Sequence, residues 1–191
     1  MLNWEHIWQN CHNPLSTETT KTLIWEQIHL NFFTQYCHNK GTGDIIECPL
    51  CHIIPDSRMH IILACAFTKD LWQALEPHLL LIDPGRVDEY EMAFGIKNAN
   101  TPQKHLRNWL TFKLRQSISR QEQIAHNHPN INNTTQVKKR MNKEVRKEIL
   151  HKYHASKKNH TMHTFLKHFQ CFDTVVDITD TNIEVGDVFN I

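Results

Sequence analysis

Three cysteines and one histidine within residues 48–65 have the spacing of a metal site. The segment reads Cys48-x2-Cys51-x8-His60-x4-Cys65. Two cysteines separated by two residues can direct both sulfurs at one ion, and a second pair four residues apart near a helix start can complete a tetrahedron. Sulfur with one imidazole favours zinc over magnesium or calcium. The sequence therefore predicts one Zn²⁺ bound by Cys48, Cys51, His60 and Cys65.

Two alternatives to this ligand set remain open. His52 is the rival fourth ligand, but its position next to Cys51 makes tetrahedral closure harder, so we favour His60. The other alternative is a group of three buried thiols and a core histidine that hold no metal. Four protein ligands would leave no open coordination position, which makes the predicted site structural rather than catalytic. A structural ion contributes its binding free energy directly to folding.

Helices are expected to carry these ligands, because apolar residues recur at helical spacing through the first half of the chain. The expected helices cover residues 2–10, 19–37 and 58–76. The second is apolar on nearly all sides, so we expect it to be buried, and Pro77 is expected to end the third. A short strand over residues 44–47 would lead into Cys48. Together these elements predict a small helical zinc-binding module over residues 1–96.

Three further helices are expected after this module. Thr101 followed by Pro102 marks a helix start, because proline fits the first helical position. A linker over residues 126–135 separates this helix from the next. The apolar ridges of the three helices are Leu106, Leu110, Leu114 and Ile118, then Val137, Met141, Val145 and Ile149, then Met162, Phe165, Leu166 and Phe169. We expect a basic helical extension over 97–170, then an acidic tail over 171–191 that is a strand or frayed. The predicted fold class is mainly α, with few short strands.

Charge is strongly segregated along the chain. The 191 residues sum to a net charge of +1, which taken alone suggests no electrostatic partner. Residues 1–96 carry 5 basic and 12 acidic side chains, residues 97–170 carry 16 basic and 3 acidic, and residues 171–191 carry 5 acidic and none basic. Such asymmetry is typical of chains that bind nucleic acid or carry a basic arm.

The basic side chains crowd two successive expected helices. The candidate phosphate contacts are Arg107, Lys113 and Arg115 on the first helix and Lys138, Lys139, Lys143, Arg146 and Lys147 on the second. A surface of this kind binds the backbone of RNA or DNA with little sequence preference. The alternative is a solvated helix face that the acidic segments neutralise. Aromatic residues near the basic helices are few, Tyr153 being one, so stacking on single strands is weakly supported.

The cysteine motif and its neighbours resemble a known family. The matching residues are Trp25-x3-His29, Cys48-Pro49-Leu50-Cys51, His60-Ile61-Ile62-Leu63-Ala64-Cys65 and Trp72. They are similar to the zinc-binding region downstream of reverse transcriptase in the polyproteins of non-LTR (LINE-like) retrotransposons. The resemblance covers residues 4–96 well and is looser from Phe94-Gly95-Ile96 onward. It implies a C-terminal fragment of an element's second reading frame, which assists RNA or target DNA engagement during target-primed reverse transcription.

The chain departs from a complete element of that family. It has no Tyr-x-Asp-Asp polymerase motif and no endonuclease pattern, so we expect no catalytic activity from it. Its first residues do not resemble a secretory signal, and its longest apolar runs are too short to span a membrane. We therefore expect an intracellular protein, in the nucleus or cytoplasm, with no small-molecule substrate. The alternative function is a structural zinc scaffold for protein–protein interaction, as a domesticated or degenerate remnant.

Overall fold

The computed structural model describes residues 4–29, 47–53, 59–128, 131–170, 172, 175–179 and 182–189. Helices dominate this part of the chain, and two short antiparallel strands follow them, which confirms the expected mainly α fold. The elements are α1 (Trp4–Cys11), α2 (Glu18–His29), the π-helical turn η1 (His60–Ala64), α4 (Ala66–Ile82), α5 (Glu89–Phe94), α6 (Pro102–Asn127), α7 (Thr134–Lys158), α8 (Met162–Phe169), β1 (Val176–Ile178) and β2 (Ile183–Val185).

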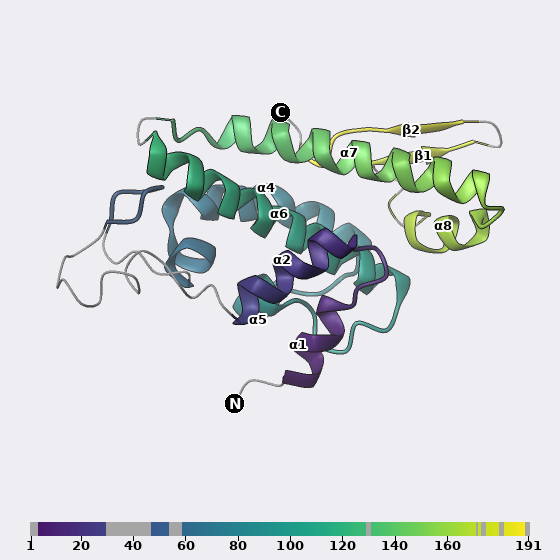
Figure 1. Cartoon of the computed structure of the whole chain (residues 1–191), viewed down its shortest axis with the longest axis horizontal. Helices are drawn as coiled ribbons and strands as arrows, with labels where there is room; N and C mark the ends of the chain where they lie inside the picture. The colour runs from purple at the N-terminus through teal and green to yellow at the C-terminus, as the bar shows by residue number, and fades with distance from the viewer. Residues whose placement is uncertain are drawn as a thin grey trace.

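Helix α6 lies at the centre of the molecule. It contacts α4, α5, α7, α8 and η1, while α7 runs along one long edge and α1 lies on the opposite side (Figure 1). The apolar ridges expected on α6 and α7 are both buried. One cluster of buried side chains includes Cys48, Leu110 and Phe189. It therefore joins the zinc-binding module, the basic extension and the acidic tail that the sequence predicts.

The start of α6 follows the expected pattern. Thr101 is the residue that caps the helix, and its Oγ1 accepts a hydrogen bond from the Lys104 N–H at 3.3 Å. Pro102 occupies the first turn, where its missing N–H leaves no intrahelical bond unmade. The start of α6 could be predicted from the sequence because helix capping depends on residues that are close together along the chain.

The structure differs in two ways from the single helix expected over residues 58–76. It is divided at Cys65, where the backbone is extended between η1 and α4. Helix α4 also passes through Pro77 and ends at Ile82, so the expected stop at Pro77 is wrong. Proline removes one backbone hydrogen bond, but Leu75 and Leu79 continue the same buried face on both sides of it, and their packing offsets the loss.

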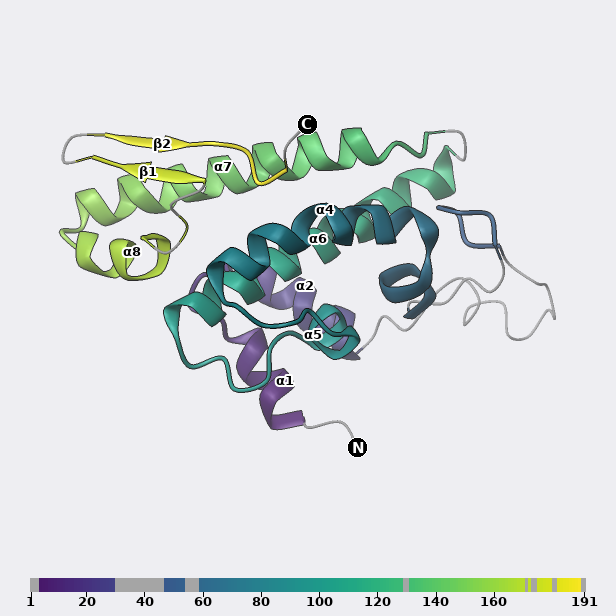
Figure 2. The same cartoon turned by 180° about the vertical axis from the view of Figure 1, so that it is seen from behind.

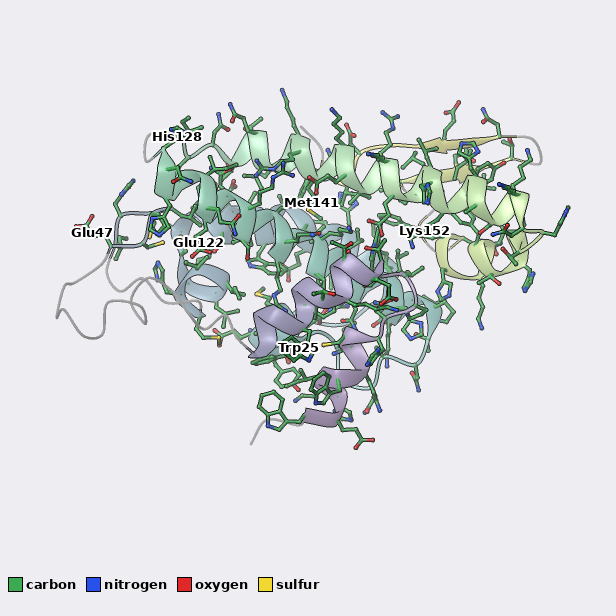
Figure 3. All side chains as sticks on the ribbon, viewed as in Figure 1. Trp25, Glu47, Glu122, His128, Met141 and Lys152 are labelled. Atoms are coloured by element: carbon green, nitrogen blue, oxygen red, sulfur yellow. The ribbon has the colours of Figure 1, made fainter. Side chains whose placement is uncertain are left out.

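The expected helix over 19–37 is present as far as the structure describes it. Helix α2 covers Glu18–His29, and residues 30–46, with most of the expected strand over 44–47, lie outside the described residues. The described side chains of α2 are not buried on all sides of the helix. Ile24 is buried, but Trp25 is 39% exposed, and its ring lies 6.5 Å from that of Trp8 on α1. Trp25 extends from α2 beside α1 in Figure 3.

The acidic tail forms a hairpin that packs on α7. Strands β1 and β2 pair antiparallel, with Val176 opposite Val185 and Ile178 opposite Ile183. Strand β2 contacts α7, and the hairpin lies along this helix in both views (Figures 1 and 2). The inward side chains of β2 are buried while Glu184 points to solvent. The sequence left open a strand or a frayed tail, and burial of the alternating apolar residues decides for the strand.

Two asparagines join α1, α6 and the turn after α5. The Asn10 side-chain amide donates to the carbonyls of Phe94 at 2.9 Å and Ile96 at 3.1 Å. The Asn108 amide donates to Asn10 Oδ1 at 2.9 Å, and Asn108 Oδ1 accepts from the Ile96 N–H at 2.6 Å. Gly95 sits inside this network with a φ of 83°, a conformation that favours glycine.

We expect Gly95→Ala to lower the free energy of unfolding by about 1–3 kcal/mol, because an added Cβ strains the backbone and displaces the amides. That Cβ would lie 2.8 Å from Asn10 Nδ2 and 2.9 Å from Asn108 Oδ1. Gly85→Ala is the matched control, since its Cβ would meet only Arg107 at 3.8 Å. Urea denaturation measures both variants, and equal stabilities for them would contradict this account.

Candidate functional site

The four candidate metal ligands come from two short segments. Cys48 and Cys51 belong to a tight turn, in which the Cys48 N–H donates to the Ile53 carbonyl at 3.0 Å and the His52 N–H donates to the Cys48 carbonyl at 2.7 Å. His60 opens η1, and Cys65 is the residue that caps α4. We call residues 47–53 the knuckle; Glu47, labelled in Figure 3, lies at its start near one end of the molecule.

The donor atoms of these four side chains converge. Cys48 Sγ lies 4.0 Å from Cys65 Sγ, and Cys51 Sγ lies 3.2 Å from His60 Nε2. All four atoms lie within 4.8 Å of one another. A tetrahedron with metal–sulfur bonds of about 2.3 Å and a metal–nitrogen bond of about 2.0 Å has edges of roughly 3.5–3.8 Å. The arrangement is therefore close to the size that one bound ion requires.

Backbone amides favour the ionised form of all three cysteines. Nearby backbone amides act to lower the pKa of each sulfur. These amides are those of Leu50 and Cys51 for Cys48, Ile53 for Cys51, and Phe67 and Thr68 for Cys65. Cys65 also caps the N-terminus of α4, where the helix dipole favours negative charge. Together with the convergence of the four donor atoms, this setting favours a metal site over three core cysteines.

The pKa values of the three cysteines do not shift in the same direction. The Cys48 thiol donates to the Cys65 sulfur, which raises the pKa of Cys48 and lowers the pKa of Cys65. Burial raises the pKa of Cys51. Cys48 and Cys65 are fully buried, and three thiolates cannot be accommodated together there without a positive charge, which a divalent cation supplies. The residues present therefore fit a bound metal ion.

His60, rather than His52, lies with the cysteines. His52 is exposed and does not belong to the converging group. Its backbone φ is 59°, in the left-handed region, which lets the knuckle turn back after Cys51. As the sequence predicts, His52 does not join the converging donors next to its neighbour Cys51.

Two supporting residues hold the ligand segments in place. The Trp72 indole donates to the Ile62 carbonyl at 2.8 Å, which ties α4 to the turn between His60 and Cys65. The Asn132 amide donates to the knuckle carbonyls of Pro49 at 2.8 Å and Leu50 at 3.2 Å. Trp72 was part of the motif, but no local signal identified Asn132 within the expected linker.

Three of the eight candidate phosphate contacts are interior residues. Arg107 is 2% exposed, and its Nε and Nη2 donate to Glu91 at 2.6 and 2.7 Å; its Nη1 donates to the Asp83 carbonyl. Lys113 is buried and lies 2.5 Å from Glu148. Arg115 is buried with its guanidinium over the Phe112 ring. The expectation that these three bind phosphate is therefore corrected, because α6 is buried on every side over residues 106–115.

The candidates on α7 are arranged differently. Lys138 is half-buried and lies 3.3 Å from Asp70 of α4. The others are exposed, and among the described residues none has a carboxylate oxygen within 4.0 Å of its charged nitrogen. We call these four the outer row: Lys139, Lys143, Arg146 and Lys147. Side chains with nitrogen tips project from α7 in Figure 3.

Comparisons of the chain with protein-family models, with curated proteins and with solved structures found no match. Within the described ranges, no helix is both long enough and apolar enough to cross a membrane.

Replacing His52 tests the ligand assignment. We expect His52→Gly to leave the bound metal per chain unchanged and not to lower stability, because relief of left-handed strain of about 1 kcal/mol offsets the added freedom of the unfolded chain. His60→Ala should lose tight metal binding, because it removes one of the four converging donors. Metal analysis and urea denaturation provide the readouts, and loss of metal from His52→Gly would make His52 the ligand.

Proposed function

We propose that the chain is a non-catalytic, zinc-stabilised helical module that binds nucleic acid through the outer row of α7. The observation that carries this proposal is the contrast between ion-paired and unpaired cations. Arg107, Lys113 and Lys138 each have a carboxylate partner on a neighbouring helix, whereas the outer row has none among the described residues. An unpaired basic row on an exposed helix is what phosphate binding requires.

The metal in this proposal is one structural Zn²⁺. Three thiolates and one imidazole form a soft donor set of a kind that zinc prefers, and four protein ligands leave no position for a substrate. Cys48 and Cys51 would hold the knuckle, and His60 and Cys65 would hold η1 and the start of α4. When bound, the ion supplies folding free energy by fastening these two segments together.

The metal centre also supports the helix that carries the outer row. Asn132, which bonds the knuckle, immediately precedes Asn133, whose side chain caps α7 by accepting the Gln136 N–H at 3.2 Å. Gln121 of α6 donates to the Ile131 carbonyl at 2.8 Å and fixes the same loop. The knuckle therefore packs against the start of α7, and loss of the ion would loosen the support of this helix.

The length of the outer row sets the number of phosphates it can contact. Lys139 to Lys147 spans about 12 Å along the helix at 1.5 Å per residue. A duplex presents one phosphate per strand about every 3.4 Å of its axis, so the row faces roughly three or four phosphates. Such contacts position a nucleic acid without reading its sequence. We therefore propose the backbone of RNA or DNA as the partner, with no preferred sequence from these residues.

We further propose that the module derives from a non-LTR retrotransposon and is accessory to target-primed reverse transcription. The support is the Cys-Pro-Leu-Cys knuckle, the His-x4-Cys pair and Trp72, whose indole holds the turn between the last two ligands. The chain carries no polymerase or endonuclease motif, which supports a non-catalytic role. Such a module acts where its nucleic acid is found, in the nucleus or the cytoplasm.

A protein-binding scaffold is the second candidate function. Trp4, Trp8 and Trp25 are 46%, 37% and 39% exposed, and all three belong to α1 and α2. Exposed aromatic side chains that gather on one surface are typical of protein interfaces. In this case zinc would organise the helices, and the protein would bind no nucleic acid at low salt.

Metal removal tests the zinc proposal. We expect one Zn²⁺ per purified chain, and we expect a chelator or Cys51→Ser to lower the melting temperature by roughly 10 °C or more, because several kcal/mol of folding free energy are lost. Cys11→Ser is the control, since burial raises the pKa of Cys11 to about 11 and its thiol lies outside the converging group. This control should retain zinc. An unchanged melting temperature after complete removal of metal would refute the structural role.

Salt-dependent binding tests the outer row. With four phosphate contacts, the slope of log affinity against log salt should be about −3 to −4. Lys143→Gln should reduce the magnitude of this slope by about one. Lys69→Gln removes the same charge from an exposed position on α4 and should leave the slope unchanged.

Fluorescence anisotropy with labelled duplex DNA, duplex RNA and single-stranded RNA measures these slopes. A flat salt dependence, or equal effects of the two substitutions, would argue against the outer row. Absence of binding at 50 mM salt would favour the protein scaffold.

A further inference from the structure

A hollow of about 390 Å³ lies between the outer row and the last described segment of the chain. Three of its lining residues, Lys139, Lys143 and Arg146, belong to the outer row. Asn142 of α7 and Asp187, which follows β2, complete the lining. The volume falls in the range of about 300–1,000 Å³ that small-ligand pockets occupy, so a phosphate group with its sugar can enter it.

The position of Asp187 is fixed by its neighbours. The Phe189 N–H donates to Asn142 Oδ1 at 3.0 Å, and the Asn142 amide donates to the Phe189 carbonyl at 3.1 Å. Val188 and Phe189 are 0% and 1% exposed and belong to the main buried cluster. These contacts anchor the segment on α7, and they hold the preceding carboxylate beside the basic side chains.

The carboxylate of Asp187 shares the hollow without forming a close ion pair there. Asp187 is exposed, and within the described part of the chain no cationic nitrogen lies within 4.0 Å of it. Its negative charge therefore lowers the electrostatic potential of the hollow while the cations keep their hydrogen-bond donors available. A phosphate entering the hollow would meet three cations and one opposing charge.

We propose that this hollow is a phosphate-binding subsite of the nucleic-acid surface, and that Asp187 is an internal competitor that weakens it. The inference rests on the proposed function, because it takes the outer row as the binding surface. It assigns to the acidic tail a defined role, which is to limit the affinity of α7 for nucleic-acid backbone. The ligand class is a phosphodiester, recognised by charge and not by base identity.

Two acidic residues on the strands of the hairpin provide a matched control. Asp177 and Glu184 face each other across the two strands, and both are exposed. Neither lines the hollow. Glu184→Gln and Asp187→Asn therefore change the net charge of the protein equally, but only the second changes the charge inside the hollow.

The test compares the affinities of the zinc-loaded full chain and its variants for a 20-base-pair duplex DNA and a 20-nucleotide RNA. At 50 mM salt, removal of the local repulsion by Asp187→Asn should raise affinity about three- to fivefold. Glu184→Gln should raise it less than about 1.5-fold, since an exposed charge outside the hollow is largely screened. The difference should shrink at 300 mM salt. Because Asp187 is exposed, its replacement should leave the melting temperature unchanged.

A double variant locates the effect. If Asp187 acts on phosphates held in the hollow, the gain from Asp187→Asn should fall toward onefold in the Lys143→Gln background, because the two residues then act on the same ligand group. An undiminished gain in that background would overturn the subsite. Equal gains from Asp187→Asn and Glu184→Gln would overturn the competitor role while the proposed function stands.

Other outcomes are equally decisive. Weaker binding by Asp187→Asn would show that the carboxylate contacts the ligand instead of competing with it, and would overturn the inference. Absence of binding by every variant at 50 mM salt would refute nucleic-acid binding itself, and the subsite with it.

Discussion

The burial of α6 is the constraint on which the rest of the structure depends. This helix carries Arg107, Lys113 and Arg115 into the interior, and a buried charge without a partner costs several kcal/mol. Glu91 of α5 and Glu148 of α7 supply carboxylates to the first two. These ion pairs, with the apolar ridges, fix where α5 and α7 lie against α6. Removing either carboxylate leaves a buried cation, so the pairs specify the arrangement of helices more than they stabilise it.

The charges that are segregated along the sequence are distributed differently in the folded protein, because ion pairs join cations and carboxylates from different elements. Arg107 and Lys113 in the interior and Lys138 beside α4 are each paired with a carboxylate from another element. The tail packs on α7 through its apolar residues, and Glu184 stays in solvent. The outer row thus keeps its charge even though the whole chain sums to +1. The electrostatic character of the surface follows from which cations are buried, and only weakly from the net charge.

The candidate metal centre gathers parts of the chain that no single helix holds together. The knuckle is fastened to the loop before α7 by Asn132, and η1 is fastened to α4 by Trp72. The backbone amides that lower the pKa values of the sulfurs belong to the turn and to the start of α4. A bound ion would join these segments directly, in addition to the buried side chains and hydrogen bonds through which they already meet. Such an ion would stabilise the arrangement of these segments without leaving a coordination position for a substrate.

The sequence by itself determined the features that depend on neighbours along the chain. The spacing of Cys48, Cys51, His60 and Cys65 identified the converging group, and Thr101 with Pro102 identified the start of α6, because turns, caps and helical periodicity are local. Only the tertiary structure decided the rest. It carried α4 through Pro77, and it separated the interior cations from the outer row. It also placed the tail on α7. Each of these depends on which distant segment covers a given face, and apolar periodicity marks a buried face without identifying the segment that covers it.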